Sequence, residues 1–387
     1  MINFNKAPKL DNIEKYVLEV INSGKTGGDG QYTYKCQKIL EDQLKAKKVL
    51  LTPSGTSALE IAAMLCNISS NDEVIMPAFT YVSTANAFII RNAKVIFVDI
   101  DKDTMNIDTK LIEQAITERT KVITIVHYAG VSCDMDEIMR IAHKYKLKVI
   151  EDAAQSLMST YKGDYLGTIG DFGCYSFHAT KNYSMGEGGA LVINNQEDIA
   201  LAKIIRSNGT NRNDFLEGKI NSYSWKEKGS SYIPSEILVA YLYPQLLLIN
   251  EINTDRINSW NIYYKELTVL AKENLISLPY IPDYSKHNAH TFYIKCKDIK
   301  ERSELIKFLA ENNIQASFHY IPLHKSSAGL KYTKFVGKDI FTTKESKRLL
   351  RLPMYYKMDK KDIIKVCYFI KSFYSNIKKS PNFEETS

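Results

Sequence analysis

The sequence lacks several features that would assign it to other classes of protein. It has no Cys-x-x-Cys pair, and its six cysteines are scattered along the chain, which argues against a zinc ribbon and against a disulfide framework. No apolar run approaches the roughly 20 residues that cross a bilayer, and the N-terminal MINFNKAPKLDN lacks the apolar core of a secretion signal. We therefore expect a soluble, cytoplasmic protein with reduced thiols and no membrane association.

The sequence also has no block of like charges. Its 51 Lys and Arg residues are interleaved with 44 Asp and Glu residues, and the formal net charge is +7. Without a basic stripe there is no surface that would follow a nucleic-acid backbone, so we expect no nucleic-acid partner. A modest positive balance is equally compatible with an anionic small-molecule substrate.

Length and periodicity indicate an α/β fold. Of 387 residues, 44% are hydrophobic, which suits one large and one smaller domain. Short apolar, β-branched runs alternate with segments of helical period from Lys48 to Asp152. This repeated βαβ pattern predicts a mostly parallel sheet, and its almost wholly apolar strands indicate helices on both faces. The expected helices begin near Thr56 and span about 83–91, 109–116 and 136–145.

The character of the sequence changes near residue 250. The segment NEINTDRINSWNIYYKELTVLAKENL reads as a long amphipathic helix and leads into a region rich in lysine and tyrosine. We therefore predict an N-terminal arm and large domain over residues 1–250 and a small C-terminal α/β domain over residues 251–387. The final stretch, KKSPNFEETS, is polar and without periodicity, so we expect a frayed tail.

Ligands of open α/β sheets bind beyond the carboxyl ends of the strands, so the residues at those ends are candidates for function. The stretch SGTS at residues 54–57 follows one strand and opens a helix. Its free backbone N–H groups and the positive end of the helix dipole can cradle a phosphate. An ordinary Ser or Thr N-cap explains the same residues equally well.

Two further strand ends carry aromatic and polar residues. Phe79 and Tyr81 come just after EVIM, where an aromatic side chain can cover a flat ring or simply belong to the core. Glu151, Asp152 and Gln155 follow an almost wholly apolar strand. Because a buried carboxylate loses its water, Asp152 should have a cationic partner. The alternative is that Asp152 caps the next helix.

A fourth strand end combines Ser176, His178 and a lone lysine, Lys181, with the glycine-rich turn GEGG at residues 186–189. Most lysines are solvated, but glycines let the backbone approach a ligand closely, and burial can lower a lysine's pKa so that it bonds to a carbonyl. Pyridoxal phosphate accounts for all four strand ends together. It has a phosphate, a flat ring, a pyridine nitrogen that pairs with a carboxylate and an aldehyde that reacts with a lysine.

The segments EDAAQS, SFHATKN and GEGGA, in this order and spacing, resemble the DegT/DnrJ/EryC1/StrS family of sugar aminotransferases. The resemblance extends over nearly the whole chain, through SGKTGGDG, VLLTPSGTSALE, DEVIMPAFTYVSTANAF, VHYAGVSCDMD, FHYIPLH and TTKESKRLLRLP. It implies the fold type I arrangement of aspartate aminotransferase, with pyridoxal 5'-phosphate as cofactor. Within the family, the sequence is most similar to enzymes that make dTDP-4-amino-4,6-dideoxygalactose for surface polysaccharides.

The resemblance implies a role for each candidate residue. Lys181 would hold the cofactor covalently and act as general acid and base, and Asp152 would pair with the ring nitrogen. Gln155 would lie near the ring hydroxyl, and Tyr81 would cover the ring. The phosphate would be held by Gly55, Thr56 and Ser176.

One part of the phosphate site departs from the family pattern. Relatives usually complete this site across a homodimer interface with an asparagine in a G-x-N-x-R stretch. This chain has GSSYIPSE instead, with Ser231 at the asparagine position and Ile233 at the arginine position. Ser231 can still donate a hydrogen bond, and a homodimer remains the expectation.

The resemblance also indicates substrate contacts. Tyr320 and His324 lie in a segment that family members bring near the substrate, although a packed loop histidine explains His324 as well. Lys25 and Arg212 would suit the diphosphate of a nucleotide. No histidine–carboxylate spacing suggests a metal site. The histidines expected to be surface or structural residues are His143, His287 and His290.

The implied reaction transfers nitrogen from L-glutamate to the keto carbon of a nucleotide-linked sugar. With dTDP-4-keto-6-deoxy-D-glucose it would give dTDP-4-amino-4,6-dideoxy-D-galactose and 2-oxoglutarate. An enzyme that makes the gluco epimer, or that uses another nucleotide keto-sugar, would share every residue named. A non-catalytic binding or regulatory protein, or a plain scaffold, is a weaker alternative. The family's sugar dehydratases resemble this sequence with a histidine in place of Lys181, so this lysine argues against them.

Overall fold

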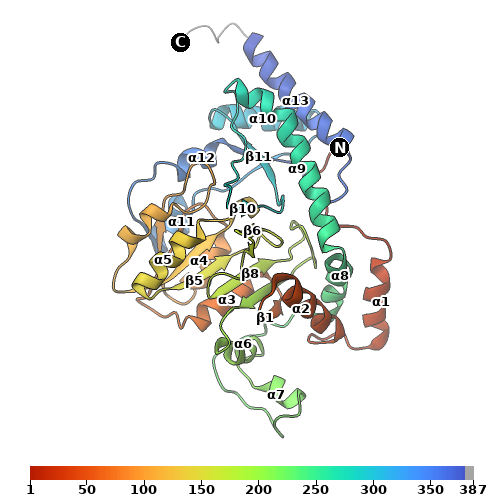
Figure 1. Ribbon diagram of the computed structural model, residues 1–387, viewed down its shortest axis with the longest axis vertical. Coiled ribbons are helices and arrows are strands. Elements are labelled where there is room, and N and C mark those ends of the chain that lie inside the picture. Colours follow the sequence, from red (N-terminus) through yellow and green to blue (C-terminus); the bar gives the residue numbers. More distant parts are fainter. Residues whose placement is uncertain (380–387) are drawn as a thin grey trace.

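The computed structural model describes residues 1–379, and a mostly parallel sheet lies at its centre (Figure 1). Within those residues the sheet has eight strands in the order β1-β9-β8-β5-β4-β2-β3-β13. Strand β9 runs antiparallel to its neighbours β1 and β8, and the other neighbouring pairs are parallel. The strands are β1 (Lys48–Thr52), β2 (Glu73–Pro77), β3 (Lys94–Val98), β4 (Thr120–Val126), β5 (Lys148–Asp152), β8 (Phe172–Ser176), β9 (Gly189–Ile193) and β13 (Thr333–Phe335).

Helices cover both faces of this sheet because successive residues of each strand point to opposite sides. Leu50 packs in the core formed with α3, α4 and α6, whereas Val49 and Leu51 pack with α2 and α8 on the other face. Helix α5 covers that second face further along the sheet, through Ile138 and Ile141. The α/β architecture predicted from the apolar strands is therefore confirmed. These helices are α2 (Gln31–Leu44), α3 (Gly55–Leu65), α4 (Val82–Ile89), α5 (Met135–Tyr145), α6 (Asp198–Arg206) and α8 (Glu236–Leu247).

A second, smaller unit with its own core begins with α9 (Ile249–Lys272), the long helix expected from the sequence. This core surrounds a three-stranded sheet of order β11-β14-β12 and includes Trp260, Phe292 and Ile363. The N-terminal arm reaches this unit, where Ile2 bridges Ile314, and β13 returns to the edge of the large sheet beside β3. A boundary at residue 250 stays a prediction. The elements of this unit are β11 (Phe292–Lys295), β12 (Ser317–Phe318), β14 (Leu349–Leu352), α10 (Ile299–Glu311) and α13 (Lys360–Lys379).

The remaining elements are helix α1 near the N-terminus, short helices and turns, and a small sheet of order β10-β6-β7. Among residues 1–379, none of the helices combines the length and the apolar composition that crossing a bilayer requires. Most of the tail that the sequence predicts to be frayed, residues 380–387, lies outside the described residues. The remaining elements are α1 (Ile13–Ser23), α7 (Arg212–Leu216), α11 (Ser327–Tyr332), α12 (Thr342–Arg348), β6 (Thr160–Tyr161), β7 (Asp164–Tyr165), β10 (Ser285–Lys286), η3 (Tyr128–Gly130) and η4 (Leu323–Lys325).

The helix expected over residues 109–116 is wrong. The segment forms two short 3₁₀ turns instead, η1 (Thr109–Leu111) and η2 (Glu113–Ala115). Side chains three residues apart eclipse one another in a 3₁₀ turn, and this places Ile112 and Ala115 together in the core under the sheet. Tertiary packing therefore overrides the helical periodicity of this short segment.

Candidate active site

A cavity of about 560 Å³ opens at the carboxyl edge of the large sheet. The ends of β1, β2, β5 and β8 meet there, and segments of the smaller unit form the facing wall. The sequence predicts functional residues at these strand ends, because parallel strands present their carboxyl ends at the same edge of a sheet. His178 lines the cavity, and so do eight of the residues to which the resemblance gives a role: Gly55, Thr56, Tyr81, Asp152, Gln155, Ser176, Lys181 and Tyr320.

One end of the cavity is formed by backbone at the start of α3. The first N–H groups of a helix have no intrahelical acceptor, and the Ser54 side chain takes only the N–H of Ser57, at 3.0 Å. A Cβ atom on Gly55 would lie 3.0 Å from Cβ of Ser176, and one on Gly189 would lie 2.4 Å from the Ser54 carbonyl carbon. The glycines thus let the end of β8 and the start of β9 come close to the positive end of the helix dipole, where an anion is stabilised.

Lys181 follows β8 in a loop that closes on itself. The Phe177 N–H donates to the Gly188 carbonyl and the Met185 N–H donates to the Phe177 carbonyl, both at 2.8 Å. A Cβ on Gly188 would lie 2.3 Å from the Met185 sulfur, so a larger residue there would have to displace the buried Met185 side chain. Burial lowers the pKa of Lys181 to about 8, and the nearby Asp152 carboxylate partly opposes that shift. A lysine of this kind is a good nucleophile toward a carbonyl at neutral pH.

Asp152 ends β5 on the face covered by α4. Its carboxylate accepts hydrogen bonds from the Thr84 hydroxyl at 2.6 Å and the Ala154 N–H at 3.2 Å. Burial raises the pKa of Asp152, although these hydrogen bonds and the positive charge of Lys181 oppose the rise. The cationic partner expected from the sequence is absent from among the ion pairs of residues 1–379. Asp152 instead faces the cavity, where a protonated ring nitrogen would pair with its carboxylate.

Gln155 and Tyr320 connect the two walls of the cavity. The Gln155 side-chain oxygen accepts the Ala129 N–H at 2.7 Å, and its amide nitrogen donates to the Tyr320 hydroxyl at 3.0 Å. Tyr320 in turn stacks on His319, with ring centroids 3.9 Å apart. Burial raises the pKa of Tyr320, so its hydroxyl stays protonated near neutral pH. Tyr81 lines the cavity as well, with its ring centroid 6.3 Å from that of Tyr320.

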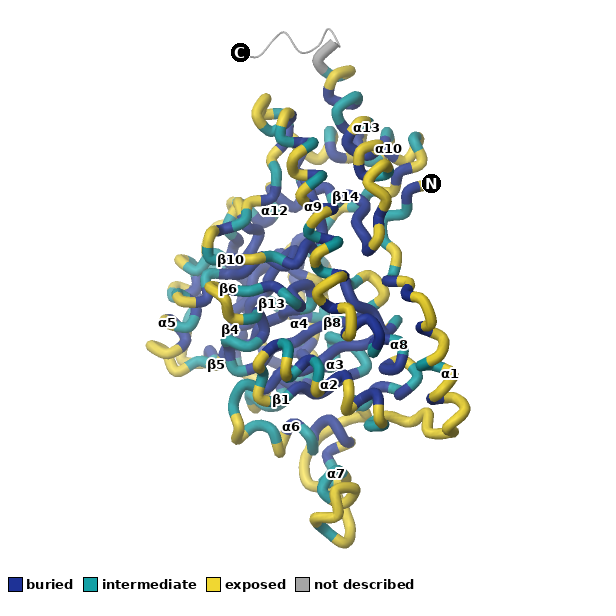
Figure 2. The backbone as a smooth tube through the Cα atoms, turned by 45° about the vertical axis from the view of Figure 1, so that its right-hand side comes forward, coloured by how far each residue is buried: buried dark blue, intermediate teal, exposed yellow. Residues whose placement is uncertain are grey.

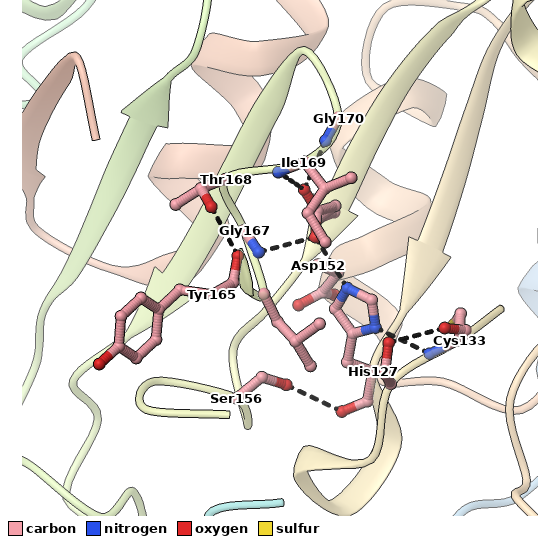
Figure 3. A network of polar contacts seen from close by, with 12 residues as sticks. His127, Cys133, Asp152, Ser156, Tyr165, Gly167, Thr168, Ile169 and Gly170 are labelled. Atoms are coloured by element: carbon pink, nitrogen blue, oxygen red, sulfur yellow. Dashed lines mark hydrogen bonds and ion pairs between the residues drawn. The ribbon is translucent and has the colours of Figure 1, made fainter. Parts of the chain in front are cut away.

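A network of polar contacts holds the end of β5 on the side of the strand that faces away from Asp152 (Figure 3). The Glu151 carboxylate accepts the N–H groups of Gly167, Ile169 and Gly170 at 2.7–2.8 Å. It also contacts His127 Nε2 at 3.0 Å. Because the Cys133 N–H donates to Nδ1 of His127, Nε2 carries the proton and donates to Glu151. Glu151 is therefore fully hydrogen-bonded on the face of β5 opposite Asp152, and it anchors the strand that presents Asp152 to the cavity.

Four candidate residues do not line the cavity of their own chain. Lys25, Arg212 and Ser231 are exposed at other parts of the surface. His324 packs against the Phe335 ring and lies 3.0 Å from the Asp339 carboxylate, in agreement with the alternative of a packed histidine. Phe79, weighed as a cover for a ring, is a core residue.

The structure adds residues that the sequence did not indicate. Arg351 and His319 line the cavity from the smaller unit, and so do Phe4 and Asn5 from the N-terminal arm. His290 was expected to be a surface or structural residue, but it lines the cavity, and burial holds its pKa well below the usual range. No short-range pattern could have found these residues, because each is more than 100 residues from Lys181 and only tertiary folding brings them together.

The residues present fit pyridoxal phosphate. The cavity combines a helix N-terminus with two serines at one end, a carboxylate at the end of β5 and a lysine with a lowered pKa. Each matches one functional group of that cofactor. The fold and the site together define a pyridoxal-phosphate-dependent transferase.

Comparison with known proteins gives the same class. The chain matches the DegT/DnrJ/EryC1/StrS aminotransferase family over residues 9–371, and it belongs to that family. It is 36% identical to an uncharacterized protein of Methanocaldococcus jannaschii over 376 residues, which cover 94% of this chain and 95% of that protein. It is 31% identical to the GDP-perosamine synthase of Escherichia coli O157:H7 over 376 residues, covering 95% and 98%. The protein is therefore a pyridoxal-phosphate-dependent aminotransferase of the sugar-modifying kind.

Solved structures share the fold. A putative sugar aminotransferase from Streptococcus pneumoniae, in its PMP form, superposes with a TM-score of 0.89 at 24% identity, covering 97% of this chain and 100% of that one. At this identity the match shows the fold alone, and it confirms the predicted fold type I arrangement.

Proposed function

We propose that this enzyme transfers the amino group of L-glutamate to dTDP-4-keto-6-deoxy-D-glucose, giving dTDP-4-amino-4,6-dideoxy-D-galactose and 2-oxoglutarate for surface-polysaccharide synthesis. The observation that carries the proposal is the buried Lys181, with its lowered pKa, in one cavity with Asp152 and the α3 N-terminus. These are the groups that aminotransfer requires. Six free cysteines support a cytoplasmic location for the reaction.

The bound cofactor would supply an electron sink that stabilises negative charge on the carbon losing its proton. In the proposed mechanism, Lys181 Nζ accepts the proton from the donor's α-carbon in the first half of the reaction. In the second half, it donates a proton to the former keto carbon of the sugar. Its pKa of about 8 suits both directions near neutral pH. Asp152 keeps the ring nitrogen protonated, and Thr84 holds the Asp152 carboxylate in place.

The other proposed contacts position the ring and the phosphate. Tyr81 covers the ring, and Gln155, itself held by the Ala129 N–H, lies near the ring hydroxyl. Thr56 and Ser176 bind the phosphate together with the N–H groups of the helix start. Tyr320 lies where a substrate would enter, and His324 acts only by packing the loop that carries it.

Three of the proposed contacts need a second subunit. Ser231 lies outside the cavity of its own chain, so its proposed hydrogen bond is to the cofactor phosphate of a homodimer partner. Lys25 and Arg212 are exposed, and their proposed role is to bind a nucleotide diphosphate held at the partner's cavity.

The identity of the nucleotide and the epimer of the product are the most specific parts of the proposal. The Escherichia coli relative is named for a GDP-linked product, so the dTDP preference and the galacto product rest on the whole-chain resemblance described in the sequence analysis, and no single motif distinguishes them. An enzyme that makes the gluco epimer, or that takes another nucleotide, would keep the same catalytic residues. A binding protein without turnover is the least supported alternative, because Lys181 and Asp152 are both in place.

The test is to determine the product. The purified enzyme is incubated with L-glutamate and, separately, the dTDP-, UDP- and GDP-linked 4-keto-6-deoxyhexoses, and each product is examined by proton NMR. A small H3–H4 coupling means an axial amine and supports the galacto product. A large coupling means the gluco epimer and contradicts the substrate-level proposal while leaving the aminotransferase assignment standing.

A matched variant tests the role of Lys181. The substitution Lys181→Ala should lower turnover by a factor on the order of 100 to 10,000 or more, because it removes the general acid and base. Cofactor retention should persist through the phosphate and ring contacts. Turnover close to wild type would contradict the assignment of Lys181.

A further inference from the structure

His290 lies on the cavity wall that the smaller unit forms, and neither the sequence motifs nor the proposed mechanism gives it a role. The residue is half-buried at this wall. Hydrogen bonds hold both its backbone and its ring. The direction of these bonds determines which ring nitrogen carries the proton, and so what kind of group the ring can bind.

The backbone around His290 is fixed by two buried side chains. Arg256 of α9 donates to the carbonyl oxygens of Ala289 and His290, at 3.1 and 2.7 Å. The Asn288 side-chain oxygen accepts the His290 N–H at 3.0 Å, and the Asn288 amide nitrogen donates to the Gln155 carbonyl at 2.9 Å. These bonds tie His290 to the loop that follows β5, so its position relative to the cavity is defined.

Asn182, the residue that follows Lys181, determines the tautomer of the His290 ring. The Asn182 amide nitrogen donates to the Asn288 carbonyl at 3.0 Å, so its oxygen faces Nδ1 of His290, also at 3.0 Å. An amide oxygen only accepts hydrogen bonds, so Nδ1 carries the proton. Burial and the positive charge of Lys181 hold the pKa of His290 well below its usual range, so the ring is neutral near pH 7. Nε2 therefore keeps a lone pair.

Nε2 is the ring nitrogen that remains to face the cavity, because Nδ1 is occupied by Asn182. Nearby residues of the same wall, Arg351 and Tyr320, present N–H and O–H donors. This wall thus offers an acceptor as well as donors, a combination that suits a ligand with hydroxyl groups. The bond to Asn182 also places the acceptor close to Lys181, the group that is proposed to donate a proton to the former keto carbon of the sugar.

The proposed acceptor sugar has one hydrogen-bond donor on the two carbons next to its reacting carbon. In a 4-keto-6-deoxyhexose, C5 bears the ring oxygen and a methyl group, neither of which donates. C3 bears a hydroxyl group. We propose that Nε2 of His290 accepts a hydrogen bond from this hydroxyl group, so that the enzyme selects keto-sugars that carry it. This inference rests on the proposed function, because it names a specificity-determining contact to the proposed sugar.

The test compares two sugars without turnover. A keto-sugar binds to the holoenzyme without reacting when no amino donor is present, so calorimetry measures its affinity alone. The probes are dTDP-4-keto-6-deoxy-D-glucose and the same compound without the C3 hydroxyl. The wild type should bind the deoxy compound about 3- to 10-fold more weakly, as expected for losing one hydrogen bond to a neutral acceptor. His290→Phe, which keeps a flat ring without nitrogen atoms, should bind the two compounds equally.

Three further variants show whether the acceptor atom itself is responsible. His290→Gln places an amide oxygen near the position of Nε2 and should recover part of the preference for the hydroxyl. Asn182→Ala removes the group that holds Nδ1 protonated, so the preference should fall. His143→Phe, which replaces an exposed histidine of α5, should match the wild type. Retention of the bound cofactor's visible absorbance and of the melting temperature establishes that each variant is folded.

The outcomes separate this inference from the proposed function. If His290→Phe keeps the wild-type preference for the hydroxyl, or the wild type has none, the inference is wrong. If His290→Phe slows the reaction with L-glutamate alone as much as it weakens sugar binding, His290 acts on Lys181 and the inference is also wrong. If the wild type binds neither dTDP compound, the proposed substrate fails, and the same pair of sugars linked to UDP and GDP decides the inference.

Discussion

At the scale of single residues, the site depends on charges held close together with little water. The Asp152 carboxylate stabilises the ammonium form of Lys181, whereas burial and the positive charge of Arg351 disfavour it. Burial has the largest effect, so the amine of Lys181 is partly neutral at physiological pH. The negative charge of Asp152 and the positive charge of Arg351 therefore have opposite effects on the pKa of Lys181, the group that is proposed to transfer protons.

This balance predicts how Lys181 reacts. Only the neutral amine is nucleophilic, so in cofactor-free enzyme the rate of acetic anhydride labelling at Lys181 should rise with pH through a midpoint near 8. Asp152→Asn removes a charge that raises this pKa, so the midpoint should move to lower pH. Arg351→Gln removes a charge that lowers it, so the midpoint should move to higher pH. Mass spectrometry of the labelled peptide measures all three.

Opposite shifts in these two variants are the signature of a purely electrostatic effect. A wild-type midpoint near 10.5, the ordinary value for lysine, would show that Lys181 is solvated and would remove the physical basis for its proposed role.

At the scale of elements, β5 is the strand on which the site depends. Its last two residues point to opposite faces: Asp152 faces the cavity, and Glu151 faces the loop at residues 167–170. Four donors converge on the Glu151 carboxylate, one of them from His127. A carboxylate is needed there because both of its oxygens act only as acceptors.

Substituting this carboxylate should therefore destabilise the enzyme. Glu151→Gln places an NH₂ group against backbone N–H groups and leaves buried donors unsatisfied, at about 1–3 kcal/mol each. We expect the melting temperature to fall by several degrees, at roughly 2–4 °C per kcal/mol. Scanning calorimetry of the holoenzyme measures this change.

The matched control lies on the surface of the same α/β unit. Glu137→Gln removes a half-exposed carboxylate that pairs with Arg140, and such pairs contribute about 0–1 kcal/mol. Equal melting temperatures for Glu151→Gln and Glu137→Gln would show that the network behind β5 does not stabilise the fold.

At the scale of the whole molecule, one projecting segment carries several exposed apolar side chains. The segment that follows α7 projects from the body of the molecule, at the bottom of Figures 1 and 2, and residues 221–230 are all exposed. It carries Tyr223 and Trp225, which are 50% and 76% exposed, and Leu216 of α7 is 59% exposed. Large apolar side chains grouped in this way favour an interface with another protein. The proposed homodimer, in which Ser231 reaches the partner's phosphate site, would cover them.

We predict that the wild type sediments as a homodimer. The double variant Tyr223→Ala/Trp225→Ala should show a larger monomer fraction, and its activity should fall in proportion. Tyr368→Ala, which removes an exposed tyrosine of α13 at the other end of the chain, should leave the dimer intact. Sedimentation velocity with parallel activity assays measures both. A wild-type monomer with full activity would contradict the dimer.

The α/β class, the strand ends where the site lies and the helices of the βαβ repeats, except the one expected over residues 109–116, could be predicted from the sequence. These follow from short-range periodicity and from the rule that parallel strands present their carboxyl ends at one edge. Lys181, Asp152 and Gly55 could be found because each lies beside a strand in its own local motif.

The distant residues that complete the cavity could not be predicted, because long-range folding brings them there. Arg351 and His290 reach it because the smaller unit folds back over the carboxyl edge, and nothing near them in the sequence indicates this position. Conversely, His324 resembles a substrate contact by motif but packs against Phe335 and pairs with Asp339, and it is not among the residues that line the cavity. Local patterns determine where a chain can place a functional group, and long-range packing determines which groups meet there.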